Sequence, residues 1–577
     1  MRLILHYLKN YKKIGIVNVL SVFGFALVEL GIPTIVAMMI DNGALKGDTD
    51  YILQMGLVML VISLIGVGGT ILLGYCCAKI STSITRDIRN DIFNKVQQFT
   101  AFEFNKFGTS SMITRTNNDA YQIQTFVNVL LRTALMTPVM FVASFIMTAR
   151  ASIPLSLVIA TTIPMIIIGV VIVARISKPI SENQQNSLDG LNRISRENLS
   201  GIRVIRAFHN DDYEQQRFDD MNHQFTGYSK KLFKLMSLTS PIFFMVMNLA
   251  ALAIFWVAAL LIENNALQVG QLVAFMDYLF HAMFSVMLFC TVFMQYPRAE
   301  VSAKRIQEVL DTEPLIMNPK NGKMEGDQSG TIEFDHVTFV YPDGEEPILH
   351  DISFKAKKGE TIAFIGSTGS GKSTLVNLIP RFYDVTSGHI YIDGVDLRDY
   401  DLFALRSKLG VIPQKAMLFS GTIEENIRFG KEHATHEEVE HAAKTAQGLD
   451  FIMEKEKHFE EEITEGATNV SGGQKQRLSI ARALVRKPDI YVFDDSFSAL
   501  DFKTDAKLRH DLKKETKDSI VMVVAQRISS IMDADRIVVL DEGNVIGIGT
   551  HKELLKNCQI YHEIALSQLS EEELNHE

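Results

Sequence analysis

The sequence predicts a membrane α-helical domain of six transmembrane helices fused to a soluble α/β domain. The chain of 577 residues is several times the usual length of one domain, so at least two folded units are expected. Six long apolar stretches all lie before residue 300. Beyond residue 330, short apolar runs typical of strands alternate with helical runs, which is the pattern of an α/β domain.

The first half of the chain contains stretches long enough to cross a bilayer. A hydrocarbon core of about 30 Å needs about 20 helical residues. The stretches that meet this requirement cover residues 14–40, 52–78, 126–148, 152–174, 241–263 and 268–295. The two long connections, 79–125 and 175–240, are rich in Lys and Arg, and such loops stay in the cytoplasm. We therefore expect a multi-pass protein of the cell membrane with both termini in the cytoplasm.

The residues before the first span combine basic and apolar side chains. Leu3, Ile4, Tyr7 and Leu8 recur at helical spacing among several Lys and Arg residues. A short helix lying at the membrane interface has this pattern, and so does a simple flanking anchor.

Ionisable side chains within the predicted spans need an explanation, because an unpaired charge in lipid costs several kcal/mol. Glu29 lies in the first span and Arg132 in the third, whereas Asp277 and His281 share one face of the sixth. Such residues either line a substrate path or brace one helix against another. Glu29, Asp277 and His281 are the candidates for a substrate path.

A polar segment rich in Pro, Gly and Asn separates the two halves at residues 313–330, and this composition is typical of a linker. We therefore expect a transmembrane domain over residues 1–312. The second domain is expected over residues 331–577.

A glycine-rich loop in the second domain predicts phosphate binding. An apolar strand predicted at 361–365 precedes it and a helix predicted at 374–379 follows it, as a phosphate-binding loop requires. Backbone N–H groups at the glycines close around phosphate oxygens, Lys372 reaches the β- and γ-phosphates, and the Ser373 hydroxyl binds Mg²⁺. The candidate residues are Gly366, Ser367, Thr368, Gly369, Ser370, Gly371, Lys372, Ser373 and Thr374.

A second element completes the predicted nucleotide site. The apolar run Ile490–Asp494 ends in a carboxylate, as needed for a metal ligand at the C-terminal edge of a strand. Together with the loop, Asp494 predicts a P-loop nucleotide-binding domain with ATP and Mg²⁺ as cofactors.

The segment Val470-Ser471-Gly472-Gly473-Gln474 precedes this strand and resembles the signature of ATP-binding cassette (ABC) proteins. The similarity covers essentially the whole chain. It is similar to the half-transporters of bacterial heterodimeric multidrug exporters, of the EfrC and LmrC type. The resemblance implies an exporter fold with an ABC cassette, and ATP hydrolysis that drives amphipathic drugs or similar hydrophobic compounds out of the cytoplasm or the inner leaflet.

The resemblance also implies roles for single residues of the cassette and for two turns. Tyr341 corresponds to the aromatic residue that stacks on adenine. Gln414 corresponds to the glutamine that contacts Mg²⁺ and water. The turns near residues 102–111 and 210–213 correspond to the coupling helices that dock on the cassettes.

In this family the nucleotide lies between the phosphate loop of one cassette and the signature of the other. Ser471, Gly472, Gly473 and Gln474 are therefore expected to contact the ATP of a partner subunit. Asp501 matches the loop that communicates across the dimer.

Two positions depart from the family pattern. Asp495 follows Asp494 where the family has the glutamate that orients or deprotonates water, and Gln526 stands where it has a histidine. An amide cannot carry a proton reversibly. The resemblance therefore implies a degenerate ATP site in this chain and a homologous partner with intact catalytic Glu and His.

Other functions remain as alternatives. A lipid or peptide exporter, or an ATP-gated regulatory membrane protein, would share the same machinery. The net charge of −10 and the absence of a basic aromatic module give no reason to expect nucleic acid as a partner, whereas membrane lipid and hydrophobic small molecules are expected.

Overall fold

The computed structural model describes residues 1–264 and 266–569, and the chain forms two compact units. The first unit comprises Met1–Gln97 with Phe107–Thr312. The second comprises Gln98–Lys106 with Glu313–Glu577. Residues 570–577 of the predicted second domain lie outside the described part of the chain.

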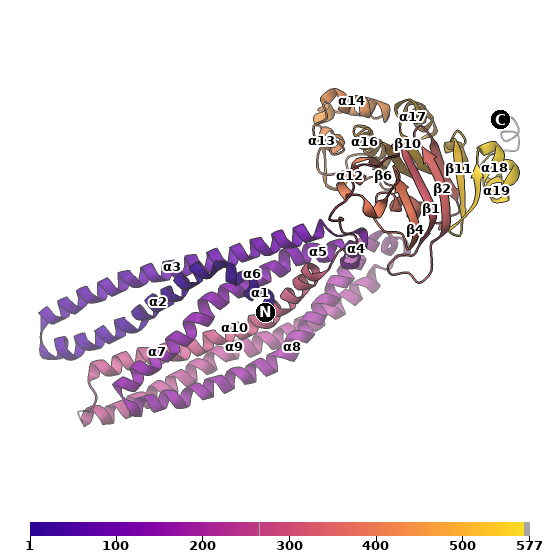
Figure 1. Cartoon of the computed structure of the whole chain (residues 1–577). Coiled ribbons are helices and arrows are strands. Elements are labelled where there is room, and N and C mark those ends of the chain that lie inside the picture. Colours follow the sequence, from indigo (N-terminus) through magenta and orange to yellow (C-terminus); the bar gives the residue numbers. More distant parts are fainter. Residues whose placement is uncertain (265, 570–577) are drawn as a thin grey trace. The chain divides into compact units, whose positions relative to one another are not determined.

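The first unit is a bundle of long helices (Figure 1). Six helical segments of the described chain are long and apolar enough to cross a membrane, which confirms the six predicted transmembrane helices. The segments cover Arg2–Lys46, Thr49–Val96, Thr109–Ala151, Ile153–Phe208, Asp211–Glu263 and Val269–Asp311. Each is longer than the apolar stretch that predicted it, because polar residues with good helix propensity continue the same helix.

The helices of this half of the chain follow one another with short connections. Two π-helical segments, Arg115–Asp119 and Leu130–Ala134, join α5, α6 and α7 into one continuous segment. The helices are α1 (Arg2–Leu8), α2 (Lys12–Met38), α3 (Thr49–Val96), α4 (Ala101–Phe107), α5 (Thr109–Thr114), α6 (Ala120–Val129), α7 (Leu135–Ala151), α8 (Ile153–Phe208), α9 (Asp211–Glu263) and α10 (Val269–Asp311).

The two predicted turns are shorter in the structure than the sequence suggested. His209, with a left-handed φ of 53°, ends α8, and α9 begins at Asp211, so residues 211–213 are helical rather than part of the turn. Acidic residues in the first turn favour this early start. Most of 102–111 is also helical, and only Gly108 (φ 75°) interrupts it.

Small residues bring the membrane helices close together. A Cβ on Gly69 of α3 would lie 3.4 Å from the Cα of Gly24 of α2, so these backbones nearly touch. The start of α10 is held in a similar way, since Gly270 N donates to Asp41 Oδ1 at 2.6 Å. Close backbone approach at small residues is the usual means of helix association in lipid.

The cassette is built on two larger sheets. A six-stranded sheet has the order β12-β11-β3-β10-β9-β6, and a four-stranded sheet has the order β2-β1-β4-β5. The strands are β1 (Thr331–Phe339), β2 (Leu349–Lys357), β3 (Thr361–Gly366), β4 (Ser387–Ile392), β5 (Val395–Asp396), β6 (Leu409–Ile412), β7 (Gly421–Thr422), β8 (Glu462–Ile463), β9 (Ile490–Asp494), β10 (Ile520–Val524), β11 (Arg536–Asp541) and β12 (Asn544–Gly549).

Helices cover both faces of the six-stranded sheet, as in other α/β folds. The cassette helices are α11 (Lys372–Leu378), α12 (Leu402–Ser407), α13 (Ile423–Arg428), α14 (His436–Thr445), α15 (Leu449–Met453), α16 (Gly472–Leu484), α17 (Phe502–Glu515), α18 (His551–Asn557) and α19 (Gln559–Gln568). Helix α11 begins at Lys372, two residues earlier than predicted, because the loop lysine and serine form its first turn.

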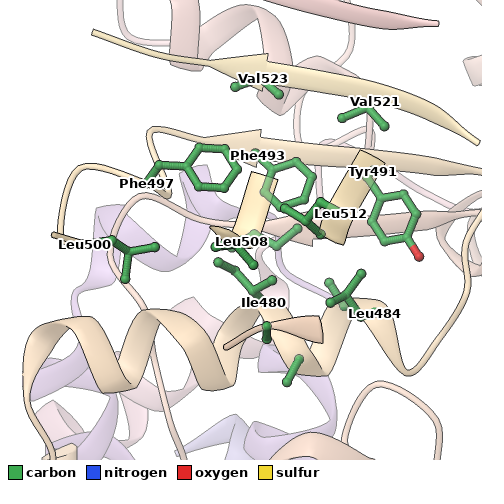
Figure 2. Packing of buried hydrophobic residues seen from close by; sticks show 14 of the residues in the cluster. Ile480, Leu484, Tyr491, Phe493, Phe497, Leu500, Leu508, Leu512, Val521 and Val523 are labelled. Atoms are coloured by element: carbon green, nitrogen blue, oxygen red, sulfur yellow. The ribbon is translucent and has the colours of Figure 1, made fainter. Parts of the chain in front are cut away.

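The core beneath the site packs strands β9 and β10 against α16. Figure 2 shows the rings of Tyr491 and Phe493 between the strands and the helix that carries Ile480 and Leu484. Strands β3, β10 and β9 are parallel, so their carboxyl ends meet at one edge of the sheet. This edge places the glycine-rich loop after β3 beside Asp494 at the end of β9.

Candidate functional site

The glycine-rich loop has the backbone that its glycines allow. Gly371, just before α11, has a φ of 92°, and a Cβ there would lie 2.7 Å from Leu349 Cδ2. A Cβ on Gly366 would meet the Leu540 carbonyl oxygen at 2.0 Å. Only glycine fits at these two positions without a shift of the surrounding chain.

Lys372 lies inside this loop. Its Nζ donates to the carbonyl oxygens of Gly366 (2.9 Å) and Ser367 (2.7 Å) and to Ser370 Oγ (3.2 Å). Burial lowers the pKa of Lys372, and the nearby carboxylates of Asp495 and Asp494 oppose this effect. The loop therefore holds its ammonium group among backbone oxygens at the N-terminus of α11, where anions are also favoured.

Two of the three residues predicted to bind Mg²⁺, Ser373 and Asp494, are in contact. Ser373 Oγ donates to Asp494 Oδ1 at 2.9 Å, across from the loop to the end of β9. Burial is the main cause that raises the pKa of Asp494, and the Ser373 hydroxyl opposes it. A hydroxyl and a carboxylate are hard oxygen ligands that suit Mg²⁺. Gln414, the third predicted ligand, lies beside Asp495, to which its Nε2 donates at 3.1 Å.

Asp495 has different surroundings from its neighbour. Its Oδ2 accepts hydrogen bonds from Gln526 Nε2 at 2.8 Å and from Gln414 Nε2 at 3.1 Å. Its φ is 47°, which is unusual for a residue with a side chain. Burial raises the pKa of Asp495, while the Gln414 amide and the charge of Lys372 lower it. The three side chains singled out as catalytic positions thus form one hydrogen-bonded group.

Gln568 contacts the segment that carries Gln526, and the sequence analysis did not predict it. Gln568, at the end of α19, donates from Nε2 to the Gln526 carbonyl (2.8 Å), and its Oε1 accepts from Ile528 N (2.8 Å). A cavity of about 580 Å³ is lined by Asp495, Gln526 and Gln568. Gln568 lies far along the chain, at the end of α19, and no motif marks it.

Tyr341 lies beside the first turn of α11. Its hydroxyl is 2.9 Å from Thr374 Oγ1, and its ring packs edge-on against Tyr383 at 5.2 Å between centroids. The predicted adenine-stacking residue is therefore next to the phosphate loop, and Thr374 of the loop contacts it directly.

The signature segment begins helix α16. Ser471 caps the helix reciprocally with Gln474: Ser471 Oγ accepts from Gln474 N at 3.3 Å, and Ser471 N donates to Gln474 Oε1 at 2.9 Å. A Cβ on Gly472 would meet nothing within 4 Å. Asp501 caps α17 and accepts from Thr504 N at 3.0 Å. These residues are held by their own helices, and Ser471, Gly472 and Asp501 are exposed.

The candidate substrate-path residues are only partly grouped. His281 Nε2 of α10 lies 3.4 Å from Glu29 Oε2 of α2, and Tyr278 and Thr34 hydroxyls of the same helices are 2.5 Å apart. Asp277 forms no ion pair within the described residues. The pairing of Glu29 with His281 could not be deduced from spacing along one helix.

A buried carboxylate in the segment predicted as a coupling helix was also missed. Glu103 of α4 is 2% exposed; its Oε1 accepts from Leu315 N at 3.0 Å and its Oε2 from Thr100 N at 2.6 Å. These residues all belong to the second unit. A single Glu in the segment 98–106 gives no sequence signal for this role.

The chain matches two family models, the ABC transporter transmembrane region over residues 15–287 and the ABC transporter model over residues 349–498. It is 36% identical to an uncharacterised ABC transporter ATP-binding protein of Mycobacterium tuberculosis, with 98% of each chain covered. It is 33% identical to a putative multidrug export ATP-binding/permease protein of Bacillus subtilis, with 99% of this chain and all of that one covered.

Two further likenesses concern exporters. An ATP-dependent lipid A-core flippase of Vibrio parahaemolyticus is 29% identical over 98% of this chain and 97% of its own. The structure of a bacterial Atm1-family ABC exporter with ATP bound matches with a TM-score of 0.79 and 25% identity, over 97% of this chain and 99% of that one.

Six membrane-length helices followed by a cassette with a phosphate loop define one half of an ATP-driven membrane transporter. The relatives match it over nearly their full length. The chain belongs to the ABC transporter family and is an exporter half-transporter. Its ATPase domain binds ATP, as such domains typically do with Mg²⁺, and it is a multi-pass membrane protein.

Proposed function

We propose that this chain is the slowly hydrolysing half of a heterodimeric multidrug exporter. Its own site binds ATP with Mg²⁺, and its signature completes the hydrolytic site of a partner subunit. The observation that carries the proposal is the pair of amide hydrogen bonds on Asp495, from Gln414 and Gln526.

The reach of Asp495, rather than its basicity, limits hydrolysis in this proposal. Burial raises the pKa of Asp495, which makes it a better base, so proton affinity is not the obstacle. Its carboxylate is one methylene shorter than a glutamate, and a misplacement of about 1 Å can cost about a hundredfold in rate. Its Oδ2 is also held by two amides, which direct it toward Gln414 and Gln526.

Gln526 contributes a second loss. An amide nitrogen donates hydrogen bonds but does not accept a proton from water or pass one on. Here it donates to Asp495 at 2.8 Å, so it fixes the carboxylate in place. The two changes act on the same step, because both residues lie at the catalytic positions.

The residues needed to bind ATP and Mg²⁺, in contrast to those for hydrolysis, are all present. Bound Mg²⁺ supplies charge neutralisation at the phosphates, and Ser373, Asp494 and Gln414 are the side chains that would hold it. Lys372 and the N–H groups at the start of α11 bind the phosphates, and Tyr341 stacks on adenine. This combination favours long retention of ATP.

A partner subunit supplies the second cassette. Ser471, Gly472, Gly473 and Gln474 present the N-terminus of α16 to the partner's ATP, and Asp501 communicates between the two sites. The exposed, self-capped geometry of α16 supports this role. The partner is a homologous half-transporter with catalytic Glu and His.

The cargo is an amphipathic drug or a similar hydrophobic compound, in keeping with the likeness to multidrug exporters. The Glu29–His281 pair lies next to the stacked rings of Phe280 and Phe284, whose centroids are 5.7 Å apart. Aromatic faces beside a titratable pair suit an amphipathic cation. Asp277, one helical turn from His281, belongs to the same proposed path.

A lipid is the second candidate cargo, because the chain is also similar to a lipid A-core flippase. Sealed vesicles that contain the heterodimer distinguish the two. Uptake of a fluorescent amphipathic dye without movement of a labelled lipid supports drug export, and the reverse result supports lipid translocation.

The orientation of the chain in the membrane is part of the same proposal. The basic connections lie in the cytoplasm with both termini. The segments 102–111 and 210–213, which are mostly helical, transmit movement between the cassettes and the membrane domains. Labelling of cysteines introduced at His209 and at Gly108 by an impermeant reagent tests this. Protection in intact cells and labelling after permeabilisation are expected.

The heterodimer is tested by purification of the chain alone and together with a homologous half that carries Glu and His. The proposal expects ATP-dependent dye uptake from the pair and little or none from the chain alone. Full transport by the chain alone would contradict it.

A further inference from the structure

The N-terminal helix has two different faces. The inward face, formed by Leu3, Ile4 and Tyr7, is buried, and α1 packs against α3 and α10. The outward face carries basic residues that neither the cassette chemistry nor the proposed substrate path uses.

Two tyrosines fix this helix in place. Tyr7 Oη donates to Asp91 Oδ2 and Tyr11 Oη donates to Asp87 Oδ2, both at 2.5 Å. Asp87 and Asp91 are one turn apart on α3, and Tyr7 and Tyr11 are one turn apart on the N-terminal segment. The two segments are therefore held in register, so the outward face has a defined orientation.

A hollow of about 560 Å³ lies on this outward face. Arg2, Leu5, Lys9 and Lys12 line it at intervals of three and four residues, which places them on one side of the helical segment. Leu5 is 55% exposed. The lining is completed by His6 and Leu8.

The cations of the hollow are free to bind an anion. None of Arg2, Lys9 and Lys12 forms an ion pair with a carboxylate in residues 1–264 and 266–569. On the facing helix α3, Asp91 accepts from Tyr7, and Asp87 accepts from Tyr11 and pairs with Arg86.

We propose that this hollow binds the headgroup of an anionic phospholipid. The three cations complement the negative charge of the phosphate. Leu5 and Leu8 offer apolar contact to the first part of the acyl chains. The hollow ends at Lys12, where the first membrane helix, α2, begins, and lipid headgroups lie at this depth. A soluble anion has no apolar part that could pack against the two leucines.

The site is tested by titration of the detergent-solubilised protein with phosphatidylglycerol or phosphatidylcholine, with bound lipid counted by native mass spectrometry. Each cation near an anionic surface contributes about a fivefold factor in binding. The variant Arg2→Gln/Lys9→Gln/Lys12→Gln is therefore expected to bind phosphatidylglycerol about a hundredfold more weakly. Its binding of phosphatidylcholine should match that of the wild type.

A matched control removes the same charges elsewhere in the first unit. Arg203, Lys230 and Lys234 are exposed and make no ion pair in the described residues, so their Gln variants should retain phosphatidylglycerol binding. Equal loss in the control and the triple variant would show non-specific attraction and overturn the proposal.

Two further variants show whether the triple variant loses lipid binding only because it misfolds. Arg2→Lys/Lys9→Arg/Lys12→Arg keeps every charge and should bind as the wild type does. Lys9→Gln alone should weaken binding about fivefold. Wild-type affinity for phosphatidylglycerol in both Gln variants, or equal affinity of the wild type for the two lipids, would refute the site.

Discussion

Asp494 and Asp495 are adjacent at the end of one strand, yet they have different partners. Asp494 accepts from the hydroxyl of Ser373 in the phosphate loop, whereas Asp495 accepts from the two amides of Gln414 and Gln526. In the proposed function, the first arrangement would hold Mg²⁺ beside the phosphates. In the same proposal, the second replaces a proton-transfer pair by two amides that hold the carboxylate, so that ATP binding and ATP hydrolysis would be separated within one site.

The largest effect is expected for the residues that are proposed to bind ATP. Lys372→Ala removes the charge that faces the phosphates, and charged hydrogen bonds are worth about 1.5–3 kcal/mol each. ATP affinity should fall about a hundredfold in a fluorescent nucleotide titration. Lys503→Ala, at an exposed position of α17, is the control and should bind normally. Unchanged affinity in Lys372→Ala would mean that this loop does not bind the nucleotide.

The effect of Mg²⁺ on ATP binding should depend on only one of the two carboxylates. Asp494→Asn is expected to weaken the Mg²⁺ enhancement of ATP binding at least about tenfold, since even the loss of an outer-shell partner of a metal ligand commonly costs about ten- to a hundredfold. Asp495→Asn should keep the enhancement close to that of the wild type, because its carboxylate faces amides. Titration of Mg²⁺ at fixed ATP measures both. An equal loss in the two variants would remove the distinction between them.

A smaller effect is expected at the end of α19. Gln568→Ala deletes two hydrogen bonds to the segment that carries Gln526, so the free energy of unfolding should fall by about 1 kcal/mol. Gln559→Ala on the same helix removes only an exposed bond to Glu563 and serves as the control. Thermal unfolding compares them, and identical melting temperatures would exclude a positioning role for Gln568.

The smallest effect concerns pH. Burial raises the pKa of Asp494 above its ordinary value of 3.8, so the folded state binds a proton more readily than the unfolded state. The ionised side chain therefore costs stability at neutral pH, and this cost disappears as pH falls below the ordinary value. Asp494→Asn should raise the melting temperature of nucleotide-free protein at neutral pH and not in acid. A gain that grows in acid would contradict this sign.

The sequence predicted those parts of the site that are local in the chain. The phosphate loop, its lysine and the strand ending in Asp494 lie within short segments whose residue types dictate their chemistry. The first two residues of α11, Lys372 and Ser373, were not predicted as helical because they precede its apolar pattern.

Contacts between distant segments were beyond sequence reasoning. The Glu29–His281 pair, the Gln568 bonds to the segment after β10, and the burial of Glu103 each join residues that share no spacing rule. The six membrane helices were found because length and apolarity alone identify them. Their polar extensions were underestimated, since helix formation continues past the apolar part.

In the proposed function, Asp495 and Gln526 make this chain's own site slow. Single-turnover hydrolysis at this site, measured in the heterodimer with the partner's catalytic Glu replaced by Gln, tests it most directly. Asp495→Glu/Gln526→His should raise the rate about a hundredfold, because reach and proton transfer are restored together. A rate equal to that of the unmodified site would contradict the account.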